Sequence, residues 1–179
     1  QAQNSFLEKQ MTYPRVKEAF SLEEKNLIIE FKEKNITWPP SDIYIRSFKA
    51  ELVLELWVKE GDEFKLFKAY PVCKGSGILG PKIKEGDRQV PEGLYSIDRF
   101  NPVSAFWLSL GINYPNKADL FRSTNNKPGG DIFIHGNCVS VGCSNSTFIL
   151  PVFGSKGHSS GVLSSLKHCP FECHICDFL

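Results

Sequence analysis

The spacing of the hydrophobic residues is helical in the first forty positions of the chain. The apolar residues that follow this spacing are Val16, Phe20, Leu27, Ile28 and Phe31. Ser21, followed three residues later by Glu24, has the pattern of a capping box, which predicts that a helix starts at Ser21. The segment TWPPSD, residues 37–42, then ends the helix. We therefore expect a short N-terminal helical lead-in over residues 1–40.

Apolar and polar residues alternate from residue 43 onward, which is the spacing typical of strands. Two alternating runs within residues 43–72 are separated by KEGDE, and this arrangement predicts a β-hairpin. Residues 73–92 are rich in Gly and Pro and are expected to form a long ordered loop. Further short strands are expected in the segments GLYSI, FWLSLGINYPN and GGDIFIHG, at 93–97, 106–116 and 129–136. The pattern predicts a mainly β domain over residues 41–150.

Length and composition indicate an ordinary globular chain. It has 179 residues, of which 41% are hydrophobic and 23% charged, enough for one domain with a core. The net charge is +1 and the lysines are spread among glutamates, so no basic stripe points to a nucleic acid partner. No apolar run reaches the roughly 18 residues that a transmembrane helix needs.

Residues 151–179 form an atypical tail that is rich in Cys, His, Ser and Gly. Three of the six cysteines lie there, and the tail also contains His168 and His174. These residues match no strong zinc template, so no metal site is expected. Cys173 and Cys176 form a C-x-x-C pair, but they lack the βαβ context of a thiol oxidoreductase. A disordered or disulfide-scrambled tail is the favoured interpretation.

The segment DIFIHGNCVSVGC, residues 131–143, carries the candidate chemistry. His135 ends an apolar run that is expected to be a strand, and Cys143 follows eight residues later, directly after Gly142. A thiol with an ordinary pKa of about 8.5 becomes a nucleophile when a nearby imidazole takes its proton. The Gly142–Cys143 backbone would bind the oxyanion, and Ser140 would add a hydroxyl donor. A Cys138–Cys143 disulfide beside a structural histidine remains an alternative at this point.

Several motifs in order resemble the L,D-transpeptidase (YkuD-type) catalytic domain. The segment IHGNCVSVGC is similar to the family's active-site signature, in the Gram-negative subgroup that reads His-Gly-x-Cys-Val-Ser-x-Gly-Cys. The upstream hairpin and the segment LGINYPN also fit. The resemblance covers roughly residues 42–143. Its upstream motif residues are Gly80, Pro81, Lys82, Gly86, Asp87, Pro91, Glu92, Gly93 and Tyr95.

The resemblance implies a mainly β fold, a sandwich or mixed sheet of the L,D-transpeptidase type, and cell-wall chemistry without a cofactor. Such enzymes, which take part in cell wall biogenesis and cell shape, attack peptidoglycan stem peptides through a Cys thioester. An amine or water then resolves the thioester, so the enzyme acts as a transferase or a hydrolase. In the nearest subgroup, hydrolytic release of a wall-anchored lipoprotein is the associated activity, and hydrolysis is therefore favoured slightly. The expected location is the periplasm, although no signal peptide is visible in this sequence.

The resemblance also suggests roles for single residues. His135 would be the base and Cys143 the nucleophile, with Gly142 and Ser140 as further catalytic groups. Gly136, Lys82 and Tyr114 would contact the substrate. Many family members carry a second histidine directly before the Gly-Cys pair, where this chain has Val141.

The sequence departs from the family pattern after Cys143, where SNSTFILPVF does not match. A reading-frame shift just past the nucleophile is one explanation, which the coding DNA would test. If this explanation holds, the domain lacks its closing elements. The alternative to an enzyme is therefore a catalytically impaired module that has the same fold and binds peptidoglycan without turnover.

Overall fold

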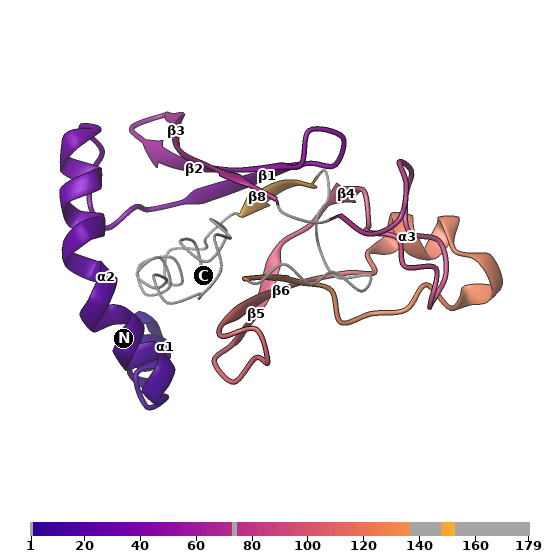
Figure 1. The fold of residues 1–179 in the computed structure, drawn as a ribbon, viewed down its shortest axis with the longest axis horizontal. Coiled ribbons are helices and arrows are strands. Elements are labelled where there is room, and N and C mark those ends of the chain that lie inside the picture. Colours follow the sequence, from indigo (N-terminus) through magenta and orange to yellow (C-terminus); the bar gives the residue numbers. More distant parts are fainter. Residues whose placement is uncertain (1, 73–74, 137–147, 153–179) are drawn as a thin grey trace.

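The computed structural model describes residues 2–72, 75–136 and 148–152, with the backbone alone for residues 2–5 and 148–152. The helices are α1 (Ala2–Gln10), α2 (Pro14–Glu33) and α3 (Lys117–Arg122), with a 3-10 turn η1 (Thr124–Asn126). The strands are β1 (Ile43–Phe48), β2 (Val53–Glu60), β3 (Glu63–Pro71), β4 (Gly93–Leu94), β5 (Ile97–Asn101), β6 (Ser109–Ile112), β7 (Phe133–His135) and β8 (Phe148–Val152). The expectation of a mainly β chain with an N-terminal helical segment is confirmed (Figure 1).

The N-terminal helices differ from the prediction in where they start. Helix α2 begins at Pro14, seven positions before Ser21, so the capping-box prediction is wrong. Proline suits the first helical turn, where its missing N–H is not needed. The Ser21 hydroxyl instead donates to the Glu18 carbonyl inside the helix, at 2.7 Å. Helix α2 packs beside the larger sheet, where Phe31 lies 4.4 Å from Phe67 between ring centroids.

The first sheet has five strands in the order β3-β2-β1-β8-β4. Neighbouring strands in this sheet are antiparallel, except for β4 and β8, which are parallel, so the sheet is mixed. The prediction of a two-stranded hairpin over residues 43–72 has the wrong number of strands, because this segment forms the three strands β1, β2 and β3. The extra turn at residues 49–52 places Leu52 at φ 53° and contains no Gly or Pro that would have announced it.

The second sheet has the order β5-β6-β7 and is antiparallel. Its three strands lie within or beside the segments expected from alternation, and β7 ends at His135 as expected. Helix α3 and strand β8 were not anticipated. Strand β8 crosses residue 150, where the expected domain boundary lies.

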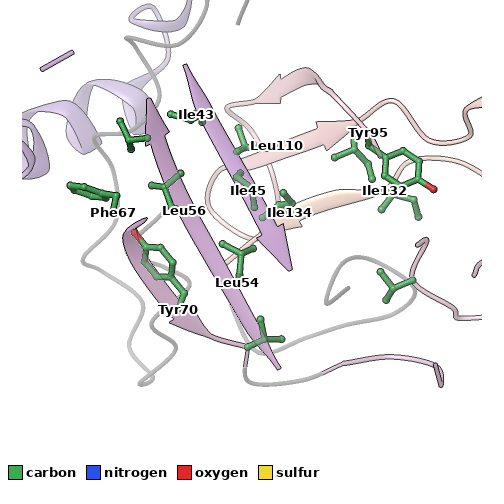
Figure 2. Packing of buried hydrophobic residues seen from close by; sticks show 14 of the residues in the cluster. Ile43, Ile45, Leu54, Leu56, Phe67, Tyr70, Tyr95, Leu110, Ile132 and Ile134 are labelled. Carbon is green, nitrogen blue, oxygen red and sulfur yellow. The ribbon is translucent and has the colours of Figure 1, made fainter. Parts of the chain in front are cut away.

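Apolar side chains from both sheets meet in one core. Figure 2 shows Ile45 and Leu54 of the first sheet close to Ile134 and Leu110 of the second. Ile45 is fully buried, and Leu110 and Ile134 are 4% and 3% exposed. At about 25 cal/mol per Å² of apolar surface, the burial of such side chains is the main force that holds the two sheets together. Residues 75–92, as expected, contain no helix or strand.

Candidate active site

Strand β7 places His135 at the margin of the second sheet. Its neighbour Ile134 belongs to the core between the sheets. Because side chains alternate along a strand, the imidazole of His135 points to the other face. This face is covered as well, since His135 is only 7% exposed. A histidine buried at a strand end has a fixed backbone and a restricted side chain.

The tautomer of His135 follows from its hydrogen bond. Nδ1 lies 2.7 Å from the carbonyl oxygen of Gly136. A carbonyl oxygen can only accept, so Nδ1 carries the hydrogen in this arrangement. In the neutral imidazole, Nε2 is then the basic nitrogen. Gly136, expected to contact substrate, is thus seen to orient the histidine through its carbonyl.

The second restraint on His135 is the ring of Phe106. The two ring centroids are 4.2 Å apart and the planes differ by 19°, so the rings are stacked. Burial lowers the pKa of His135 below its usual value, against the opposite effect of the hydrogen bond to Gly136. A lowered pKa keeps the imidazole neutral near pH 7, which is the form that accepts a proton.

Lys82 lies inside the Gly-rich loop, where its ammonium is held by the loop itself. Nζ donates to Asp87 Oδ1 at 2.7 Å and to the Lys84 carbonyl at 2.9 Å. Both side chains of this pair are nearly buried, with exposures of 6% and 7%. Burial raises the pKa of Asp87, but the hydrogen bonds from Lys82 and the N–H groups of Gln89, Lys84 and Ile83 outweigh it and lower the pKa to about 2.

A second lysine, Lys49, fastens the same loop to the first sheet. Its ammonium donates to the carbonyls of Ile78, Gly80 and Val90, at 2.8–3.0 Å, and to Glu92 Oε1 at 3.0 Å. The motif residues Gly80 and Glu92 therefore have structural partners. Lys49 was not singled out from the sequence, because a lysine that follows a strand gives no sign of being buried.

Tyr114 and Tyr95 are both buried, and their ring centroids lie 6.1 Å apart. The Tyr114 hydroxyl donates to the Pro128 carbonyl at 3.1 Å, and burial raises its pKa above the usual value. The Tyr95 hydroxyl donates to Asp119 Oδ1 at 2.8 Å. No hydrogen bond of the described residues joins Lys82 or Tyr114 to His135. A substrate contact at these two residues stays a prediction.

The other expected site residues lie outside the described part of the chain. They are Cys143, Gly142, Ser140, Cys73 and Cys138, together with the His and Cys residues of the tail. Within residues 2–72, 75–136 and 148–152, no three His, Cys, Asp or Glu side chains form a group that could hold a metal ion. None of the helices described is both long and apolar enough to cross a bilayer.

Phe106 is the residue at this site that sequence analysis missed. It lies in a segment expected to be a strand, but β6 begins only at Ser109 and Phe106 is in the preceding turn. Aromatic residues are common in strands, so the phenylalanine favoured a strand at a position that is in fact a turn. Only the folded chain brings it to His135, from 29 positions away in sequence.

No protein-family model matches the chain. Over 105 residues the chain is 42% identical to "Putative L,D-transpeptidase YafK" of Escherichia coli strain K12, and equally to that of Escherichia coli O157:H7. The match covers 58% of this chain and 42% of each relative, so it spans about two fifths of the relatives' length.

Two solved structures also match part of this chain. The helical cell shape determining protein Pgp2 of Campylobacter jejuni has 23% identity and a TM-score of 0.44, covering 62% of this chain and 41% of that one. Bd1075 of Bdellovibrio bacteriovorus has 24% identity and a TM-score of 0.41, covering 64% and 41%. The similarity to L,D-transpeptidases that the motifs indicate is confirmed by the 42% identity to the Escherichia coli relatives.

Proposed function

We propose that the chain carries the catalytic domain of a cysteine acyl-transfer enzyme that acts on peptidoglycan stem peptides. The observation that supports this proposal most directly is the state of His135. It is buried, stacked on Phe106, and bonded through Nδ1 to Gly136, which leaves Nε2 as the basic nitrogen. A base held in this way has the properties that activation of a nearby thiol requires.

The proposed reaction proceeds in two steps. In the first, Nε2 of His135 takes the proton of the Cys143 thiol, and the thiolate attacks the carbonyl of an L-centre next to a D-centre. The S–C bond of a thioester forms as the C–N bond breaks, and the imidazolium returns its proton to the leaving amine. The Gly142–Cys143 backbone N–H groups stabilise the oxyanion, at about 3 kcal/mol for each donor.

In the second step, water or an amine attacks the thioester carbonyl and His135 takes a proton from the attacking group. The new C–O or C–N bond forms as the S–C bond breaks, and the imidazolium returns the proton to the departing Cys143 thiolate. Water gives cleavage, and an amine gives a cross-link or an attached protein. We favour hydrolysis, on the resemblance to the subgroup described above, with the periplasm as the place of action. The substrate carbonyl belongs to meso-diaminopimelate in this proposal, and a wall-anchored lipoprotein is the protein that hydrolysis would release.

A second candidate is a module that binds stem peptides without turnover. It is favoured by the departure of the sequence from the family pattern after Cys143. In that case Lys82 and Tyr114 would matter for binding, and Cys143 would be dispensable.

Incubation of the protein with purified wall fragments, followed by mass analysis, separates the two candidates. The enzyme is expected to release products and to carry a thioester adduct on Cys143. The Cys143→Ala variant, which lacks the nucleophile, should give neither result. Binding of fragments without adduct or product would favour the non-catalytic module and contradict the proposed chemistry.

A further inference from the structure

The loop that carries Phe106 is fastened to the N-terminal helices by one arginine. Arg15 is the second residue of α2. Its Nη1 atom donates to the carbonyls of Ser104, at 2.5 Å, and Trp107, at 3.0 Å. Its guanidinium also lies over the Trp107 ring, 5.6 Å from the centroid. Phe106 lies between these two residues in sequence, so Arg15 binds the backbone of the turn on both sides of Phe106.

The backbone of this turn is strained at Trp107. Its φ is 76°, in the left-handed region that side chains with a Cβ rarely adopt. Such a conformation is unfavourable for a residue with a Cβ and persists only where the surrounding structure holds it. The contacts of Arg15 to the Trp107 carbonyl and ring are surroundings of this kind.

Within the turn, a further bond fixes Phe106 itself. The Phe106 N–H donates to the Ser104 hydroxyl at 3.1 Å. Ser104 is buried, and its carbonyl is one of the two that Arg15 binds. The path from α2 to the histidine therefore runs through direct contacts, from Arg15 to Ser104 and Trp107, then to Phe106, and then to the imidazole of His135.

We propose that Arg15 and Phe106 are positioning residues for His135, with Phe106 fixing the plane of the imidazole and Arg15 fixing Phe106. This inference rests on the proposed function for its catalytic consequence. It also gives the N-terminal helices a role, because α2 supplies Arg15.

The stacked ring has two physical effects on the histidine. A flat ring 4.2 Å away blocks rotation of the imidazole about its χ2 angle, so Nε2 keeps one direction. It also excludes water from one face, which contributes to the burial that lowers the pKa of His135. Burial and the Gly136 carbonyl are the influences that described residues exert on this pKa.

NMR titration of the His135 imidazole tests the inference without requiring any catalysis. The variants are Phe106→Ala, Phe106→Leu, Phe106→Tyr, Arg15→Met and the double variant Arg15→Met/Phe106→Ala. Phe106→Ala is expected to raise the pKa of His135 toward its ordinary value. Phe106→Tyr, which keeps a flat ring, should behave as the wild type, and Phe106→Leu should fall between them.

Arg15→Met is expected to shift the pKa in the same direction as Phe106→Ala, by less. In the double variant the effect should equal that of Phe106→Ala alone, because both residues act along one path. Matched controls are Phe121→Ala, whose ring is 90% exposed on α3, and Arg46→Met, which removes an ion pair on β1. Neither control should move the His135 titration.

Activity on wall fragments, measured in parallel, gives the catalytic consequence. Phe106→Ala should lower kcat by about tenfold with little change in KM, because misdirected Nε2 affects the chemical step more than binding. The acidic limb of the pH profile should move with the NMR titration.

An unchanged His135 titration in both Phe106→Ala and Arg15→Met would overturn the inference, and Arg15→Met keeps it open to refutation if Phe106→Ala fails to fold. If the variants shift the His135 titration but the wild-type protein forms no thioester with wall fragments, the positioning contacts are supported and the proposed function is contradicted.

Discussion

The Nδ1 atom of His135 lies 2.7 Å from the carbonyl oxygen of its neighbour Gly136. This short contact holds the imidazole against its own backbone and determines which nitrogen is basic. Because the acceptor is a backbone atom, no substitution at Gly136 can remove it directly.

We expect the stability of the fold to depend on His135 between pH 5 and 7. Burial lowers the pKa of His135 in the folded chain, whereas the unfolded chain binds a proton near the ordinary value of about 6.5. The unfolded state therefore holds more protons below pH 6.5, and the free energy of unfolding falls as the pH drops through this window. The free energy of unfolding, measured with urea at several pH values from 5 to 8, should depend less on pH in His135→Gln than in the wild type. An equal pH dependence in the two proteins would contradict the assigned state of the imidazole.

A second pH effect, at lower pH, is expected from Asp87. Its pKa is lowered to about 2 in the fold, so its stabilisation is complete above the unfolded value of about 3.9 and is lost as the pH falls toward 2. The stabilisation corresponds to about 2–3 kcal/mol. Asp87→Asn should lose this amount at neutral pH and show a flatter curve below pH 4. Asp62→Asn, at an exposed turn residue, is the control and should resemble the wild type.

Lys49→Met is expected to destabilise the protein by about 1–3 kcal/mol, because it leaves the buried Val90 carbonyl and the partly buried acceptors of Ile78, Gly80 and Glu92 without their charged donor. The loss should be concentrated in residues 78–92, whose carbonyls the ammonium binds. Hydrogen exchange measured by mass spectrometry should show faster exchange in this segment. Lys59→Met, which removes an exposed ion pair with Asp42, should change stability by less than about 1 kcal/mol. Unaltered exchange of the segment in Lys49→Met would count against this role.

Tyr95→Phe removes the hydroxyl that donates to the buried carboxylate of Asp119. Asp119 is 1% exposed, so water cannot replace the lost donor, and we expect a destabilisation of about 1–3 kcal/mol. The same change at Tyr44, whose ring contacts Phe64 at the edge of the sheet, should cost less than about 0.5 kcal/mol. Chemical denaturation of the two variants measures the difference, and equal midpoints would refute the role of this bond.

The strand pattern and the position of His135 could be predicted from the sequence because both depend on local order. Alternation placed β2, β3 and β7, and the turn at Gly61, which has φ 63°, was announced by its glycine. The turn before Leu52 and the start of α2 were mispredicted. The turn at residues 49–52 contains no Gly or Pro that would mark it, and α2 begins at a proline without a side-chain cap, whereas the capping-box pattern at Ser21 lies inside the helix.

The surroundings of His135 could not be predicted, because they depend on contacts between distant segments. Arg15, Phe106 and His135 come from a helix, a turn and a strand, and no spacing in the sequence relates them. The buried lysines Lys49 and Lys82 were similarly hidden, since lysine is almost never buried unless it is paired. Lys82 was expected to contact the substrate. In the structure its ammonium donates to Asp87 and to the Lys84 carbonyl within its own loop.

The central claim is that His135 activates Cys143, and alkylation of Cys143 by an electrophilic thiol probe tests it most directly. The rate is measured against pH, with the labelled site assigned by peptide mass analysis. We expect rapid labelling at pH 7 in the wild type, at least about tenfold slower labelling in His135→Ala, and a midpoint in that variant near the ordinary thiol pKa of about 8.5. Identical rates and pH profiles in the two proteins, or a Cys138–Cys143 disulfide in the native protein, would contradict the account.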